Sequence, residues 1–186
     1  PNGATWIVDV GQNQAIEFDA DGKKLRTLGG PKIRFNMPTD LAFLSDGAMV
    51  VSDGYVNSRV VKFDPDGRIM AAWGKKGSGP LQFDVPHSIA VDGKGLVYVG
   101  DRSNNRIQVF DKNSPELGKP CSNPTGQAGK CGFVTEQLIS EHTNTSIPGT
   151  AVTMSFSSDK AQSCLYVGDN SNMTLYILNR DRKSVV

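Results

Sequence analysis

The chain has 186 residues, 38% hydrophobic and 21% charged, and its 20 basic and 19 acidic residues give a net charge of +1. This composition is typical of a folded globular domain and excludes a disordered tail. The balanced charge argues against nucleic acid or an anionic membrane as a partner, and no apolar run approaches the roughly 18 residues that a membrane-spanning helix needs. Because the chain starts with Pro1 rather than Met, we expect it to be a piece of a longer protein.

The first predicted strands belong to an incomplete repeat, residues 1–34. An apolar strand ends at Asp9, and an alternating strand follows at 15–18. The same succession returns three times, at 50–63, 97–110 and 165–178. A repeat of about 40 to 50 residues with several strands per copy is the signature of a propeller blade. The first unit lacks its opening strand.

The second unit, residues 35–82, shows the whole pattern. Ser45-Asp46-Gly47 is a hairpin turn, and β-branched residues alternate after the loop 54–58. We expect four strands there, at 40–43, 48–53, 59–63 and 68–73. No segment of the chain keeps an apolar period of 3.6 residues, so the sequence predicts an all-β fold with little helix.

The third unit, residues 83–146, begins with the same spacing and is then interrupted. The segment 112–146 is rich in Gly, Pro, Ser, Thr and Asn, and we expect a long surface loop in place of the outer strand and the link. Cys121 and Cys131 lie in this insertion, and a disulfide between them would stabilise the loop by roughly 2 to 3 kcal/mol in an oxidising compartment. Their spacing is unlike that of zinc ligand pairs.

The fourth unit, residues 147–186, is the most degraded copy. It starts at 147–149, and the segment 157–163 lengthens its first turn. Cys164 follows this turn, and we expect it to be a buried small residue at the edge of a strand. His142, in the preceding insertion, matches no motif and is interpreted as solvated.

Several polar and aromatic residues recur in each unit, which argues for a structural role. We expect the aspartates to accept hydrogen bonds from backbone N–H groups, and the arginines to pair with nearby carbonyls or carboxylates. These residues are Asp53, Asp101 and Asp169 with Arg59 and Arg106. Aromatic side chains are expected to fill the space between blades, namely Phe18, Phe63, Trp73 and Phe110.

The recurring pattern Phe-Asn/Asp-x-Pro, Val-x-Asp, Asn-x-Arg, Val/Ile-x-x-Phe, Asp-Gly and Trp-Gly resembles the NHL repeat, a β-propeller blade. The stretches 52–59 and 85–110 are similar to peptidyl-α-hydroxyglycine α-amidating lyase, including the extra residue in the loop 54–58, and to bacterial NHL proteins of unassigned activity. The resemblance implies four-stranded blades, about four of a six-bladed propeller, with incomplete outer blades. We expect the open blade edges to promote association or assembly.

The lyase resemblance implies a zinc ion held by three histidines, each just after a proline at the start of an innermost strand. His87 occupies that position, and the equivalent residues of the neighbouring units are Thr39 and Gly149. Neither binds zinc well, which agrees with ligands supplied by every second blade. The other two histidines would lie outside this chain. The alternative is that His87 only donates a hydrogen bond at a strand start; calcium is left open.

Tyr55 matches the catalytic tyrosine of that family, in Asp53-Gly54-Tyr55-Val56-Asn57-Ser58-Arg59. A phenol is a poor base near neutral pH unless a cation lowers its reference pKa of about 10. In the family an upstream arginine contributes, and no position of this chain matches it. The reaction implied is the breakdown of a carbinolamide into an amide and glyoxylate. The alternative is an exposed aromatic residue in a polar loop.

Two functions are therefore open. We favour a propeller, exported to an extracellular or periplasmic compartment, that binds a protein, a peptide or a small polar ligand at the channel mouth or acts in an assembly. The alternative is a zinc-dependent lyase that cleaves a peptidyl-α-hydroxyglycine carbinolamide. Two more Pro-His pairs at alternate blades in the flanking sequence would favour the enzyme, since fold alone does not choose between the two.

Overall fold

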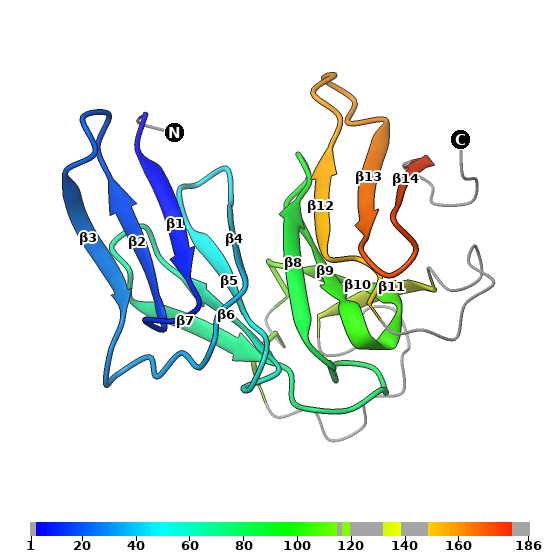
Figure 1. Ribbon diagram of the computed structural model, residues 1–186, viewed down its shortest axis with the longest axis horizontal. Coiled ribbons are helices and arrows are strands. Elements are labelled where there is room, and N and C mark those ends of the chain that lie inside the picture. The colour runs from blue at the N-terminus through cyan, green and yellow to red at the C-terminus, as the bar shows by residue number, and fades with distance from the viewer. Residues whose placement is uncertain (1–2, 115–116, 120–131, 139–148, 180–186) are drawn as a thin grey trace.

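The computed structural model describes residues 3–114, 117–119, 132–138 and 149–179. These residues form antiparallel sheets that follow one another around an arc (Figure 1). The one helical element in the described ranges is the short 3-10 helix η1, Arg102–Asn104. No helix in these ranges is long and apolar enough to cross a membrane. The predicted all-β fold is confirmed.

Each sheet is one blade, and we number the blades I to IV along the chain. Blade I contains β1 (Thr5–Asp9), β2 (Gln14–Phe18) and β3 (Lys24–Gly29). Blade II contains β4 (Asp40–Phe43), β5 (Met49–Asp53), β6 (Arg59–Phe63) and β7 (Ile69–Trp73). Blade III contains β8 (Pro86–Val91), β9 (Leu96–Asp101), β10 (Arg106–Asp111) and β11 (Phe133–Leu138). Blade IV contains β12 (Thr153–Phe156), β13 (Cys164–Asp169) and β14 (Thr174–Asn179).

A similar turn recurs in every blade, between β1 and β2, β5 and β6, β9 and β10, and β13 and β14. The strand before the turn ends at an aspartate, and the last residue of the turn has a left-handed backbone. Those left-handed residues are Asn13, Ser58, Asn105 and Met173, with φ between 50° and 58°. Non-glycine residues rarely adopt this conformation, so its recurrence shows that the turns of all blades end in the same way.

The expectation of a surface loop over 112–146 is wrong in part. Residues Phe133–Leu138 form β11, which pairs with β10 and completes the four strands of blade III. The insertion therefore lies before the outer strand and does not replace it. Leu117 and Phe133 are buried in the apolar cluster between blades II and III, which gives this segment a packing role. Its polar composition concealed these two core residues.

Three hydrophobic clusters fill the spaces between successive blades, one for each pair of neighbours. Phe63 lies between blades I and II, and Trp73 and Phe110 lie between blades II and III, as predicted. Phe18 is different, because it is half-buried and belongs to none of these clusters. The first of the predicted core aromatics therefore lies outside the core. Cys164 is a half-buried free cysteine at the start of β13.

Candidate functional site

The turn of blade II differs from the other three by one residue. Residues 54–58 separate β5 from β6, whereas four residues, 102–105, separate β9 from β10. In blades I and IV the turn is closed by its aspartate, whose carboxylate accepts the N–H of the residue three positions later. Asp9 accepts from Gln12, and Asp169 accepts from Asn172. In blade II the Tyr55 N–H instead donates to the Met37 carbonyl, 3.3 Å away, just before β4.

Gly54 allows this longer turn to approach blade III closely. A Cβ atom at Gly54 would lie 2.1 Å from the Pro86 carbonyl oxygen and 2.9 Å from Thr39 Oγ1. Both distances are shorter than van der Waals contact, so a glycine is required here for space. The Thr39 hydroxyl donates to the same Pro86 carbonyl at 2.7 Å, which joins the innermost strands of the two blades.

His87 lies near the start of β8, the innermost strand of blade III, and its ring is held from the side of blade IV. Nδ1 lies 2.8 Å from the Val152 carbonyl oxygen. A carbonyl oxygen only accepts hydrogen bonds, so Nδ1 carries the proton. In the neutral ring this assigns the free lone pair to Nε2, as in histidines whose second nitrogen binds a metal.

Tyr55 and His87 meet across the seam between blades II and III. The Tyr55 hydroxyl oxygen lies 3.0 Å from His87 Nε2, and the ring centroids are 5.5 Å apart at an interplanar angle of 84°. Because Nδ1 is protonated, the hydroxyl donates and Nε2 accepts. The two residues singled out from the sequence, 32 positions apart, are thus direct partners.

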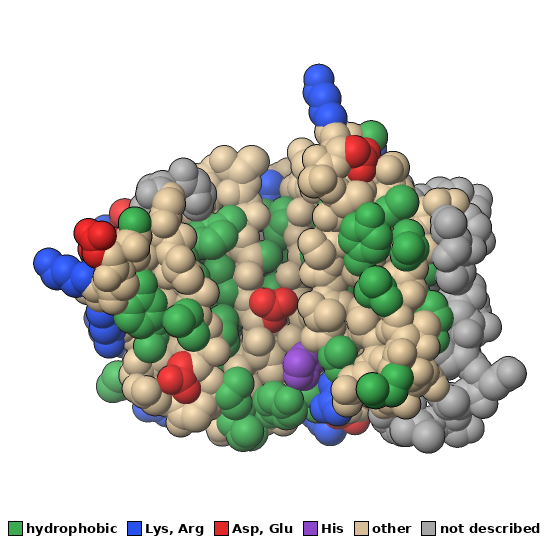
Figure 2. Space-filling model, turned by 45° about the horizontal axis from the view of Figure 1, so that its top comes forward, with side chains coloured by type: hydrophobic (Ala, Val, Ile, Leu, Met, Phe, Trp, Pro, Cys, Tyr) green, Lys and Arg blue, Asp and Glu red, His purple; other side chains and the backbone are tan. Residues whose placement is uncertain are grey.

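The pair is open to solvent and bordered by apolar side chains. His87 is the one histidine in the described ranges, and Figure 2 shows it in purple at the surface with hydrophobic side chains beside it. Met37, Tyr55 and Val56 are 39%, 38% and 54% exposed. A ligand can therefore reach the hydroxyl and the ring from outside, and apolar groups are available next to them.

Asp40 is the nearby acidic residue of the innermost strand β4. Its Oδ2 accepts the Ile89 N–H of blade III at 2.9 Å, and its Oδ1 accepts the N–H of Leu41 at 2.8 Å. Burial raises the pKa of Asp40, while the two N–H groups and the nearby His87 act in the opposite direction. Asp40 joins two blades beside the pair.

Strand pairing corrects the residue equivalent to His87 in blade IV. His87 immediately precedes the pair Ser88–Gly100, and Val152 immediately precedes Thr153–Gly168. Val152, and not Gly149 as predicted, is therefore the equivalent residue, because the lengthened turn of blade IV shifted the alignment. A valine side chain has no donor atom for a metal.

The recurrent aspartates and arginines are structural, as predicted. The Asp53 carboxylate accepts the N–H of Asn36 and the Arg59 Nε–H, each at 2.8 Å. Asp101 accepts the N–H of Asp84 at 2.7 Å and the Arg106 Nε–H at 2.9 Å. Both arginines also donate to backbone carbonyls of the preceding link. Asn36 and Asp84 lie in the segment that precedes the blade, as do the carbonyls bound by the arginines. Each Asp–Arg pair therefore fixes a blade to the link before it.

Arg102 is a candidate residue that no motif of the sequence indicates. Its backbone N–H donates to the Val85 carbonyl, two residues before His87, at 3.1 Å. Its side-chain Nε is buried and has no hydrogen-bond partner among the described residues. A buried donor without an acceptor is costly. The recurring aspartate and arginine of each turn, Asp53 with Arg59 and Asp101 with Arg106, give no sign of it.

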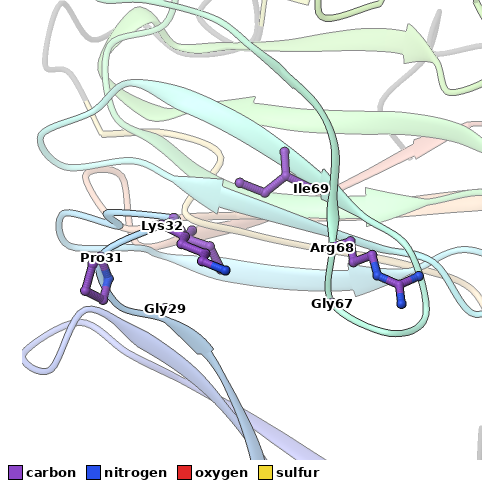
Figure 3. Close-up of a pocket in the computed structure, with 7 residues that line it drawn as sticks. Gly29, Pro31, Lys32, Gly67, Arg68 and Ile69 are labelled. Atoms are coloured by element: carbon purple, nitrogen blue, oxygen red, sulfur yellow. The ribbon is translucent and has the colours of Figure 1, made fainter.

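A separate hollow of about 580 Å³ lies between the link after β3 and the turn before β7 (Figure 3). It is lined by Gly29, Pro31, Lys32, Ile33, Gly67, Arg68 and Ile69. In Figure 3 the Arg68 side chain extends away from Lys32, so the two cations do not converge. The hollow lacks the convergent polar groups typical of a binding site.

The described residues contain no cluster of three or more His, Cys, Asp or Glu side chains suited to hold a metal ion. His87 therefore has no complete set of metal ligands within these ranges. The predicted disulfide between Cys121 and Cys131, and the solvated His142, fall on residues outside the described ranges.

Comparisons with known proteins agree with the repeat. Residues 83–110 match the NHL repeat. The chain is 40% identical over 130 residues to the peptidylglycine alpha-amidating monooxygenase of Rattus norvegicus, covering 62% of this chain and 13% of that protein. It is 36% identical over 135 residues to a probable peptidyl-alpha-hydroxyglycine alpha-amidating lyase of Caenorhabditis elegans, covering 67% and 38%. NHL repeat-containing protein 3 of Mus musculus is 35% identical over 127 residues, covering 61% and 37%.

Solved structures show the same architecture. A streptogramin B lyase has a TM-score of 0.64 at 16% identity, covering 97% of this chain and 49% of that one. A catalytically inactive virginiamycin B lyase from Staphylococcus aureus with quinupristin has a TM-score of 0.65 at 16% identity, covering 100% and 54%. At such identity the likeness concerns the fold alone. The chain thus carries an NHL repeat in a β-propeller fold and spans well under half of the curated relatives named above.

Proposed function

We propose that this chain forms part of a zinc-dependent carbon–nitrogen lyase that cleaves a peptidyl-α-hydroxyglycine. The observation that carries the proposal is the 3.0 Å contact between the Tyr55 hydroxyl and His87 Nε2. The similarity to amidating monooxygenases and lyases supports it, because it covers most of the chain. This assigns more weight to the enzyme than the sequence alone did, since the structure brings both candidate residues to one exposed place.

The environment of His87 fits a zinc ligand. The Val152 carbonyl fixes the Nδ1 proton and directs the Nε2 lone pair toward Tyr55. His87 would hold zinc through Nε2 together with two histidines from outside this chain. When bound, zinc polarises the oxygen of the carbinol and makes its proton easier to remove.

The residues of this chain then have separate tasks. In its deprotonated form the Tyr55 oxygen takes the proton of the substrate hydroxyl. The electron pair left on that oxygen forms the carbonyl of glyoxylate, the carbon–nitrogen bond breaks, and the nitrogen takes up a proton to give the primary amide. Arg102 would bind the substrate carboxylate, since its backbone N–H is bonded to the Val85 carbonyl two residues before His87.

The test uses the full-length protein and an N-acyl-α-hydroxyglycine, with glyoxylate as the product measured. We expect about one zinc per protein, lost in His87→Ala. Tyr55→Phe should lower kcat by about 10²- to 10⁴-fold with zinc retained. Tyr166→Phe, which removes the hydroxyl of a half-buried tyrosine on β13, is the matched control and should keep full activity. A folded, metal-free protein that yields no glyoxylate would contradict the proposal.

A second candidate is the binding or assembly module that the sequence favoured. Two observations support it: the similarity to NHL repeat-containing protein 3, and the exposed Met37 and Val56 beside the pair. Such a module, exported to an extracellular or periplasmic compartment, would bind a protein, peptide or small polar ligand there. Affinity capture with the full-length protein, compared with the double variant Met37→Ser and Val56→Ser, tests it. Export also predicts an oxidised Cys121–Cys131 pair in the secreted protein, measurable by mass spectrometry of unreduced peptides.

A further inference from the structure

We propose that the Tyr55 hydroxyl and zinc compete for the same lone pair on His87, so that metal loading releases Tyr55 for reaction. The inference rests on the proposed function, since it concerns the same two residues. Its basis is the pair of contacts to the imidazole ring, one to each nitrogen.

The chemistry of the ring makes the two partners of Nε2 mutually exclusive. Nδ1 lies 2.8 Å from the Val152 carbonyl oxygen and must carry a proton. Nε2 of the neutral ring then has one in-plane lone pair. That lone pair either accepts the Tyr55 O–H, as at 3.0 Å in this structure, or forms a bond to a metal. Zinc therefore has to displace the Tyr55 hydroxyl before it can bind to His87 Nε2.

The displacement is confined to one side chain, because the backbone of Tyr55 is held in place. Its N–H donates to the Met37 carbonyl, and the preceding Gly54 is packed against the Pro86 carbonyl. The side chain is 38% exposed, so it has room to rotate toward solvent. Zinc binding would thus leave the Tyr55 hydroxyl without its histidine acceptor, on a side chain that solvent can reach. Without zinc, the Tyr55 hydroxyl stays hydrogen-bonded to His87 Nε2 and does not act as a base.

The competition predicts that removal of the hydroxyl strengthens zinc binding. In the full-length protein we expect Tyr55→Phe to bind Zn²⁺ about 2- to 10-fold more tightly than the wild type, measured by competition with a chromophoric chelator. Tyr166→Phe should leave the affinity unchanged, and His87→Ala should weaken it sharply. The phenylalanine keeps the ring contact with His87 and loses only the hydrogen bond.

A second measurement follows the tyrosine itself. Titration of the wild type with Zn²⁺ should give a near-ultraviolet difference spectrum of a tyrosine that loses its hydrogen-bond acceptor, and Tyr55→Phe should lack it. Equal or weaker zinc binding by Tyr55→Phe, or the same spectrum in both proteins, would overturn the competition while zinc and glyoxylate production stand. A wild type that binds no zinc and forms no glyoxylate would overturn the proposed function itself, and the competition with it.

Discussion

The turns of blades I and III hold the next blade, whereas the turn of blade II carries the candidate site. Asn13 accepts the N–H of Met37 at 2.6 Å, and Asn105 accepts the N–H of Gly149 at 3.1 Å, so each reaches across a seam. The same position of blade II is Ser58. One added residue places Tyr55 against His87 there instead. Between blades II and III, the asparagine contact that joins the other blades is thus replaced by the Tyr55–His87 contact, which a ligand can reach.

The buried ion pairs Asp53–Arg59 of blade II and Asp101–Arg106 of blade III also differ between the two blades. We expect their removal to give the largest change in stability. Asp101→Ala removes the buried partner of Arg106, whose side chain is only 6% exposed, whereas Arg59, the partner of Asp53, is 29% exposed. Arg106 keeps a second carboxylate, Glu136, at 2.9 Å, but loss of the buried pair should still lower the free energy of unfolding by about 3 kcal/mol. We expect a smaller loss for Asp53→Ala, because water reaches Arg59. Urea denaturation of both variants measures the difference, and equal losses would contradict it.

Gly54→Ala tests whether the turn of blade II depends on close approach. The new Cβ would lie 2.1 Å from the Pro86 carbonyl oxygen, so the turn must move away from blade III. Overpacking of this kind lowers stability by about 1 to 3 kcal/mol. It should also separate Tyr55 from His87 and lower glyoxylate production. Arg102→Ala, at the equivalent position of blade III, is the control for stability and should unfold at nearly the wild-type urea concentration.

Asn105 tests the opposite kind of turn, the one that holds a seam. Asn105→Ala loses the hydrogen bonds to Gly149 and Thr150 and places alanine at a φ of 52°. We expect a loss of about 1 to 2 kcal/mol in thermal or urea unfolding. Asn105→Gly keeps the backbone conformation and removes only the side chain, so it separates the two contributions. The prediction fails if neither variant changes stability.

Asp40, which joins blades II and III beside Tyr55 and His87, is expected to give the smallest effect. This effect is a dependence of stability on pH. Burial raises its pKa above the unfolded value of about 3.9. The stability linked to this carboxyl is therefore full below that unfolded value and is lost as pH rises through the folded pKa. Asp40→Asn stays neutral, so its stability relative to wild type should increase from pH 3 to pH 7. A difference between the two proteins that is constant over this range would contradict the prediction.

Much of the fold could be predicted because the blade pattern is local. The strands of blade II were found at or within a residue of their bounds, since turns such as Ser45-Asp46-Gly47 mark them directly. β11 was missed, because its place follows from pairing with β10 across a polar insertion. The misplacement of Gly149 has the same origin, since strand register decides equivalence and a lengthened turn hides it.

For the site, the sequence supplied the residues but not their relation. Tyr55 and His87 were chosen from family resemblance on separate blades, and nothing in their spacing shows that they touch. The role of Val152 could not be predicted, because it acts through its backbone carbonyl, which carries no residue-specific signal. The same holds for Arg102, whose lack of a partner among the described residues depends on tertiary packing.

Neighbouring blades contact each other mainly through their inner strands: β1 contacts β4, β4 and β5 contact β8, and β8 contacts β12. Opening fluctuations should therefore travel blade by blade, as in other repeat arrays. β8 is flanked by a blade on each side, so we expect its amide hydrogens to exchange with deuterium more slowly than those of β1 or β12. His87 thus lies on a strand that we expect to exchange slowly, while Tyr55 lies on a turn. We therefore expect His87 to keep its position while the Tyr55 side chain moves.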